Sequence, residues 1–147
     1  MNLRIVVVGS GAIGLYYGGK LAAGGRPFNG MSILVGVDTS AILKAENLHR
    51  TALALMEEVM QAAGKCGFPL ESSTPEQLIR RTEMMGAYKP STLVDFEMGK
   101  PLEIEAIWGE PLRRGVAAGA NLPRLQLLYS LLQFVDRACQ ENATDRQ

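Results

Sequence analysis

The chain has 147 residues, enough for one ordinary domain but too few for a complete dinucleotide-binding domain together with a substrate domain. Apolar residues make up 47% and charged residues 20%, as in globular proteins, and the formal net charge is zero. The chain has no basic run and no apolar stretch near the ~20 residues that span a bilayer, so neither nucleic acid nor a membrane is an expected partner. Cys66 and Cys139 lack metal-like spacing and predict free thiols in a reducing compartment, so we expect a cytoplasmic protein without a metal site.

The first 27 residues predict the opening of a dinucleotide-binding βαβ unit. An apolar, β-branched strand over 3–8 leads into Gly9, Gly11 and Gly14 in the G-x-G-x-x-G spacing, and a helix follows to about Ala23. In this motif Gly9 allows a tight turn, Gly11 lets backbone N–H groups approach a pyrophosphate, and Gly14 allows close packing of the helix on the strand. The helix N-terminus also favours a bound anion. The predicted cofactor-binding residues are Gly9, Gly11, Ala12, Ile13 and Gly14.

Residues 31–38, with the sequence MSILVGVD, are compatible with two structures. A short apolar run cannot be assigned to strand or helix by periodicity alone. As a strand, it would be the second strand of the βαβ unit, and Asp38 would lie 24 residues after Gly14, close to the ~20 expected for the acid that binds a ribose hydroxyl. As a helix, it would begin a helical domain.

The remainder of the chain predicts a series of helices that begin and end at proline and glycine signals. The predicted ranges are His49–Lys65, Thr74–Met85, Pro90–Glu97, Glu103–Ala118 and Pro123–Cys139. We therefore expect a mainly α fold, a helical bundle with an N-terminal βα fragment. Residues 1–27 would form a partial Rossmann fragment, 28–142 a helical domain, and 143–147 a frayed tail.

Spaced residues between positions 88 and 129 form a single register. They are Lys89-Pro90-Ser91, Leu93, Asp95, Gly99, Glu103-Ile104-Glu105, Gly109, Gly119 and Pro123. This pattern resembles the C-terminal domain of the ketopantoate reductase (2-dehydropantoate 2-reductase) family, and 28–32 is similar to the start of that domain. Residues 1–25 are similar to the N-terminus of the same family. The two blocks are not adjacent in a full-length member, so the resemblance suggests an internally shortened chain.

The resemblance implies a specific chemistry. Such enzymes reduce the ketone of 2-dehydropantoate to pantoate with NADPH, in pantothenate biosynthesis, and their helical domain carries much of the substrate site and commonly supports a homodimer. By resemblance Glu103 is the catalytic residue and hydrogen-bonds the substrate hydroxyl, while Ser91 and Asn29 position the small keto acid. From the local pattern alone, the residues Glu103, Ser91 and Asn29 better suit a helix-start acid, an early-helix hydroxyl and a turn residue than a substrate site.

The family's general acid is a lysine, with an asparagine midway between it and the asparagine that matches Asn29. Counting back from Asn29 places Leu21 and Gly25 at these two positions, and neither can do that work. Lys20 is one place off and suits the surface of the first helix. We expect a reductase-like oxidoreductase with weak or no activity, because loss of a general acid costs ~10²–10⁴ in rate. One alternative is a non-catalytic helical oligomerisation or binding module, and another is an incomplete version of a longer enzyme.

Overall fold

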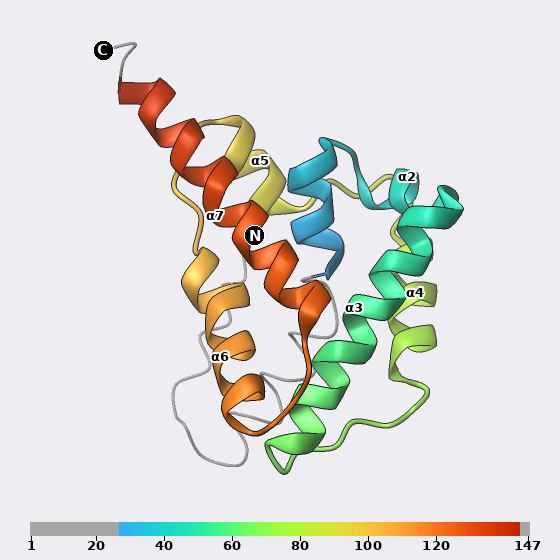
Figure 1. Ribbon diagram of the computed structural model, residues 1–147. Helices are drawn as coiled ribbons and strands as arrows, with labels where there is room; N and C mark the ends of the chain where they lie inside the picture. The colour runs from blue at the N-terminus through green and yellow to red at the C-terminus, as the bar shows by residue number, and fades with distance from the viewer. Residues whose placement is uncertain (1–26, 145–147) are drawn as a thin grey trace.

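The structure is a computed structural model that describes residues 27–144, with side chains to Asn142 (Figure 1). Residues 27–35 are helical, and the further elements are α2 (Thr39–Lys44), α3 (Glu46–Lys65), α4 (Thr74–Met84), α5 (Ser91–Glu97), the π-helix η1 (Glu105–Gly109), α6 (Glu110–Ala117) and α7 (Pro123–Thr144). Within the described range there is no strand, which confirms the mainly α fold. The predicted strand over 3–8, the cofactor-binding residues Gly9, Gly11, Ala12, Ile13 and Gly14, and the positions Lys20, Leu21 and Gly25 lie outside the described residues.

The ambiguous segment 31–38 is not a strand. Its first half continues the helix to residue 35, and the chain then turns at Gly36, whose φ of 67° is in the region that favours glycine. Asp38 is the N-cap of α2, where its Oδ1 accepts a hydrogen bond of 2.9 Å from the backbone N–H of Ala41. The suggestion that Asp38 follows a second Rossmann strand is therefore wrong, because the residue serves a local helix cap.

The predicted helices are present, with small shifts at their ends. Helix α3 starts at Glu46, before the predicted His49, whereas α4 starts at the predicted Thr74, with Ser73 as its N-cap. Helix α7 continues to Thr144, beyond the predicted end near Cys139, so the start of the predicted tail is helical. Helix α2 is one element that the sequence analysis did not predict, because six residues carry too little periodicity.

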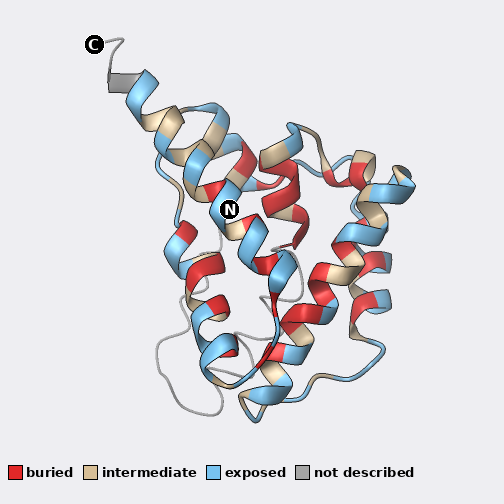
Figure 2. Cartoon of the chain, in the orientation of Figure 1, coloured by how far each residue is buried: buried red, intermediate tan, exposed pale blue. Residues whose placement is uncertain are grey.

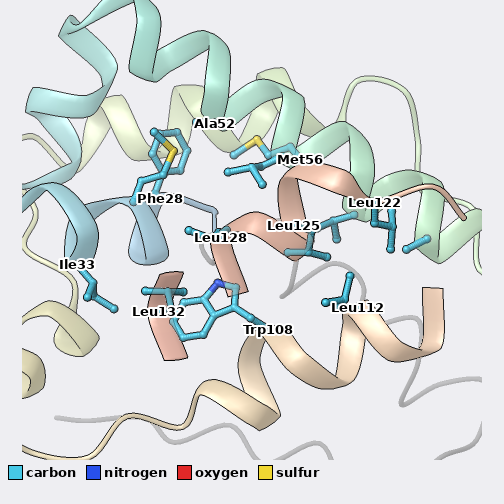
Figure 3. Packing of buried hydrophobic residues seen from close by; sticks show 14 of the residues in the cluster. Phe28, Ile33, Ala52, Met56, Trp108, Leu112, Leu122, Leu125, Leu128 and Leu132 are labelled. Atoms are coloured by element: carbon cyan, nitrogen blue, oxygen red, sulfur yellow. The ribbon is translucent and has the colours of Figure 1, made fainter. Parts of the chain in front are cut away.

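Helix α3 lies at the centre of the bundle and contacts α2, α4, α6 and α7. Its buried residues face the interior, while the outer surfaces of the surrounding helices are exposed (Figure 2). Figure 3 shows side chains from the helix over 27–35, α3, η1, α6 and α7 converging on one core. The largest fully buried side chains are Trp108, Phe28, Ile42, Met56, Leu93 and Leu132. No helix in the described part of the chain is both long and apolar enough to cross a bilayer.

Candidate functional site

The three predicted substrate residues lie on three different elements. Asn29 is half-buried in the helix over 27–35, Ser91 is the exposed first residue of α5, and Glu103 is exposed in the connection that precedes η1. Among the described residues, no hydrogen bond joins these three side chains to one another. Their assignment to a substrate site therefore stays a prediction.

Backbone hydrogen bonds fix the segments that carry Ser91 and Glu103. The N–H of Leu102 donates to Asp136 Oδ1 on α7 at 3.2 Å, and the Glu103 carbonyl accepts from the N–H of Ile107 at 3.0 Å. On the other side, the backbone N–H and the hydroxyl of Thr39 both donate to the Tyr88 carbonyl, at 3.1 and 3.0 Å. The Glu103 segment is thus tied to α7, and the approach to Ser91 is tied to the start of α2.

Two hydroxyl groups close in sequence to the predicted residues are buried without a hydrogen-bond partner. They are the Ser32 Oγ, one turn after Asn29, and the Thr92 Oγ1, next to Ser91. A buried hydroxyl left unpaired costs about 1–3 kcal/mol, so such groups are uncommon without a purpose. The sequence analysis did not single them out, because burial without a partner has no sequence signature.

The helix that carries Asn29 is packed closely against η1 through Gly30. A Cβ added at Gly30 would lie 3.2 Å from Trp108 Nε1 and 3.1 Å from Leu128 Cδ2. Trp108 is only 1% exposed and points toward Leu128 and Leu132 in the core (Figure 3). Glycine at position 30 therefore lets the indole approach the backbone beside Asn29, and this contact links the helix of Asn29 to the element that follows Glu103.

The π-helix η1 directly follows the Glu103 segment. The N–H of Glu110 donates to the Glu105 carbonyl, one residue farther back than in an α-helix. Pro111 follows at once, and it lacks the N–H that the Ile107 carbonyl would otherwise accept. The wider turn accommodates this proline within a continuous helical run over 104–117, and π-turns of this kind occur frequently at functional sites.

Four side chains form a hydrogen-bonded network over η1. Glu105 Oε1 accepts from the Tyr129 hydroxyl at 2.6 Å and from Gln133 Nε2 at 3.0 Å, and Glu105 Oε2 accepts from Arg113 Nη1 at 2.8 Å. A Cβ at Gly109 would lie 2.8 Å from Glu105 Oε2 and 2.9 Å from Tyr129 Cε2, so the network occupies the space above this glycine. The network joins η1, α6 and α7, and it fixes the turn that follows Glu103.

The network shifts the acidity of its members in the directions expected for charged hydrogen bonds. The hydrogen bond from Tyr129, followed by that from Arg113, lowers the pKa of Glu105 below its ordinary 4.5. The same bond to Glu105 raises the pKa of the Tyr129 hydroxyl, and bonds to Glu105 and Glu110 raise the pKa of Arg113. The carboxylate, the neutral phenol and the guanidinium are thus the forms that the fold stabilises.

We expect Glu105→Gln to lower the midpoint of thermal unfolding at neutral pH and to reduce its dependence on acid. Because the pKa of Glu105 is lowered in the folded state, its contribution is present above pH 4.5 and is lost as the pH falls through the lowered pKa. The measurement is the melting temperature by circular dichroism across this acidic range. The wild type and Glu105→Gln should converge, and Tyr129→Phe should show part of the same effect. A constant difference between wild type and Glu105→Gln would contradict the assignment.

The described helices do not provide a grip for the pyrophosphate of a dinucleotide. Such a grip is a turn between a strand and a helix, and residues 27–144 contain no strand. The same range holds no cluster of three His, Cys, Asp or Glu side chains that could bind a metal ion. The predicted cofactor-binding residues Gly9 to Gly14 lie outside the described range.

Comparison with known proteins places this bundle in the class of helical domains found at the C-terminus of reductases. Residues 20–136 match the family described as "Ketopantoate reductase PanE/ApbA C terminal". The 2-dehydropantoate 2-reductase of Nostoc sp. is 34% identical over 111 residues, which cover 75% of this chain and 34% of the relative. The crystal structure of 2-dehydropantoate 2-reductase from Methylococcus capsulatus superposes with a TM-score of 0.77 at 32% identity, over 82% of this chain and 42% of the other. A D-mandelate dehydrogenase shares the fold, with a TM-score of 0.78 at 19% identity over 88% of this chain and 55% of the other.

The chain belongs to the ketopantoate reductase family. The family match begins at Lys20, so it covers the described helices up to Asp136 together with a few preceding residues. The chain spans about a third of the length of the curated relatives that it matches. The fold and the family therefore rest on the matched region, which is a part of the full-length relatives.

Proposed function

We propose that the described helices are the substrate-side half of an NADPH-dependent 2-dehydropantoate reductase, and that this chain alone has weak activity or none. The family match over residues 20–136 carries the proposal, because it coincides with the helical bundle. In this proposal Asn29, Ser91 and Glu103 contact the keto acid, and Glu103 hydrogen-bonds the hydroxyl that forms on reduction.

Reduction of the ketone requires a hydride at the carbonyl carbon and a proton at the carbonyl oxygen. NADPH supplies the hydride when it is bound. Glu103 lies on a segment held by Leu102 and Asp136, so its carboxylate is presented from a fixed backbone next to η1. A carboxylate at this point can accept a hydrogen bond from the product hydroxyl, but the family uses a lysine to supply the proton.

We expect weak activity because no lysine stands at the position of the family's general acid. The positions that correspond to the family's lysine and midway asparagine are Leu21 and Gly25, and neither side chain can donate a proton or orient the ketone. Lys20, the first residue of the family match, is the nearest ammonium group in the sequence. An activity assay of the Lys20→Met variant tests whether Lys20 is the proton donor.

We predict that the full chain, mixed with NADPH and 2-dehydropantoate, consumes no NADPH above the rate without protein. The measurement is the loss of NADPH absorbance, with a full-length ketopantoate reductase as the positive control. Sustained turnover that Lys20→Met abolishes would contradict the prediction and would identify Lys20 as the proton donor. Turnover that survives both Lys20→Met and Glu103→Gln would contradict the residue assignments as well.

Binding experiments test separately whether the chain binds NADPH and whether it binds the keto acid. Saturable quenching or enhancement of NADPH fluorescence would support a functional dinucleotide-binding site at Gly9 to Gly14. Chemical-shift changes on addition of 2-dehydropantoate, weakened by Ser91→Ala and Glu103→Gln, would support the proposed substrate contacts. If neither ligand binds, that result favours the alternative function, a non-catalytic helical binding or oligomerisation module. The observation that supports this alternative is a set of exposed apolar side chains on α7, which are Leu127, Leu131 and Phe134.

A further inference from the structure

A set of half-buried polar side chains lies along one side of α7, next to the connection that carries Glu103. The members of this set are Tyr129, Gln133, Asp136 and Gln140. Residues at this spacing, three or four positions apart, lie on the same side of an α-helix. These four residues are the α7 polar face.

The beginning of the connection between α5 and η1 is bonded to the second half of α7. Gln140 Nε2 donates to the Gly99 carbonyl at 3.3 Å, and Asp136 Oδ1 accepts from the N–H of Leu102 at 3.2 Å. The connection has no regular secondary structure over 100–103. Side chains of α7 therefore hold a stretch of backbone that is not fixed by a helix of its own.

The end of the same connection is bonded to the first half of α7. The Tyr129 hydroxyl and Gln133 Nε2 donate to Glu105 Oε1, at 2.6 and 3.0 Å. Earlier residues of the connection thus bond later residues of α7, so the two segments run antiparallel beside each other (Figure 1). Glu103 lies between the two sets of bonds, and its own carboxylate is exposed.

We propose that the α7 polar face positions Glu103 for its contact with the keto acid. Its four members are positioning residues, because they act through the backbone that carries Glu103 and not through the substrate. The inference rests on the proposed function, in which Glu103 is a substrate contact. It adds the elements that give this contact its orientation.

The exposure of Glu103 makes such positioning important for affinity. An exposed carboxylate on an unrestrained connection occupies many conformations, and ordering them on binding opposes association. The apparent affinity falls in proportion to the fraction of time that the binding-competent conformation is occupied. Bonds from Asp136 on one side of Glu103 and to Glu105 on the other involve carboxylates, and charged hydrogen bonds are stronger than neutral ones. They fix the backbone before the ligand arrives.

The first test measures whether Asp136 holds the backbone next to Glu103, by amide hydrogen exchange of the full chain in NMR spectra. Asp136→Ala should speed the exchange of the Leu102 amide about tenfold or more, because its bond to a charged acceptor is lost. Asp136→Asn should keep most of the protection, because its amide oxygen can still accept. The control is Ser130→Ala, since Ser130 is exposed on α7 and its hydroxyl donates to the Gln126 carbonyl of the same helix.

The second test measures the dissociation constant of 2-dehydropantoate by chemical-shift titration of the same variants. Asp136→Ala should raise it about fivefold, as expected when the competent conformation is occupied about a fifth of the time. Tyr129→Phe should raise it by less, since Glu105 keeps its bonds from other donors. Asp136→Asn and Ser130→Ala should bind like the wild type. A purely structural role of Asp136 would change the stability and leave the dissociation constant unchanged.

Glu103→Gln separates this inference from the proposed function. If Glu103→Gln weakens binding and Asp136→Ala does not, the positioning role is wrong and the proposed function stands. If Glu103→Gln binds like the wild type, or if the wild type binds no keto acid, the proposed function is wrong and the positioning role is wrong with it. Unchanged exchange of the Leu102 amide in Asp136→Ala, or equal weakening by Ser130→Ala, would also overturn the positioning role. Thermal unfolding of each variant by circular dichroism separates loss of affinity from loss of the fold.

Discussion

Replacement of Glu58 by alanine is expected to lower the free energy of unfolding by about 2–4 kcal/mol. Glu58 lies on α3 and is only 6% exposed, and its carboxylate caps the N-terminus of α7. Its Oε2 accepts from the N–H of Leu125 at 2.8 Å, and its Oε1 accepts from the N–H and the Nη1 of Arg124 at 3.1 and 3.2 Å. Without the carboxylate, the N–H of Leu125 loses its partner inside the protein.

The capping bond has a large expected effect because it joins segments that are distant in the sequence. A carboxylate at a helix N-terminus satisfies N–H groups that have no partner within the helix and also interacts favourably with the helix macrodipole. Glu58 does this for the longest described helix, α7, from the central helix of the bundle. Its loss should therefore weaken the contact between α3 and α7 and not a local turn alone.

Urea denaturation followed by circular dichroism measures this effect, with the neighbouring exposed residue changed as a control. Glu57→Ala should remain within about 0.5 kcal/mol of the wild type, as surface substitutions usually do. Glu58→Gln should fall between the wild type and Glu58→Ala, because one amide oxygen can still accept a bond. Equal stability of Glu58→Ala and Glu57→Ala would show that the carboxylate does not cap α7.

Replacement of Gly115 by valine is expected to destabilise the fold by about 3 kcal/mol, through overpacking between α3 and α6. Gly115 is buried on α6, and a Cβ there would lie 2.7 Å from Ala62 Cβ and 2.6 Å from Leu122 Cδ1. The Leu122 side chain can rotate away, but Ala62 Cβ is attached directly to the backbone of α3. The two helices would have to separate.

Gly64 provides a matched control with the opposite expected sign. It lies on α3, is exposed, and has no atom within 4 Å of an added Cβ. Gly64→Ala should raise the free energy of unfolding by about 0.5–1 kcal/mol, because alanine loses less backbone entropy in a helix. Urea denaturation of both variants tests the pair. A Gly115→Val protein as stable as the wild type would show that α3 and α6 are not packed at this distance.

Several residues that carry the family resemblance also have a structural role in this fold. Gly109 makes room for the Glu105 network, Gly119 adopts a φ of 84° at the end of α6, and Pro123 begins α7. Asp95 pairs with Lys100 at 2.9 Å on the surface. The register that carries the family resemblance is therefore in part a set of packing and capping requirements of this fold.

The helical class, the positions of most helices and the family could all be predicted from the amino-acid sequence alone. Helix ends were predictable because glycines such as Gly67 and Gly119 and starts such as Pro123 act through local backbone conformation. For the candidate site, the resemblance in the sequence pointed to Asn29, Ser91 and Glu103. The structure shows which contacts hold the segments that carry these residues. Their contact with a substrate remains a prediction.

The packing of whole helices, and not the local sequence pattern, makes residues 31–35 helical and places Glu58 at the start of α7. It also produced the Glu105 network and left the Ser32 and Thr92 hydroxyls buried without partners. The physical reason is the range of the interactions. Caps and turns depend on neighbouring residues, whereas a carboxylate that bonds a helix more than sixty residues away depends on how whole helices pack.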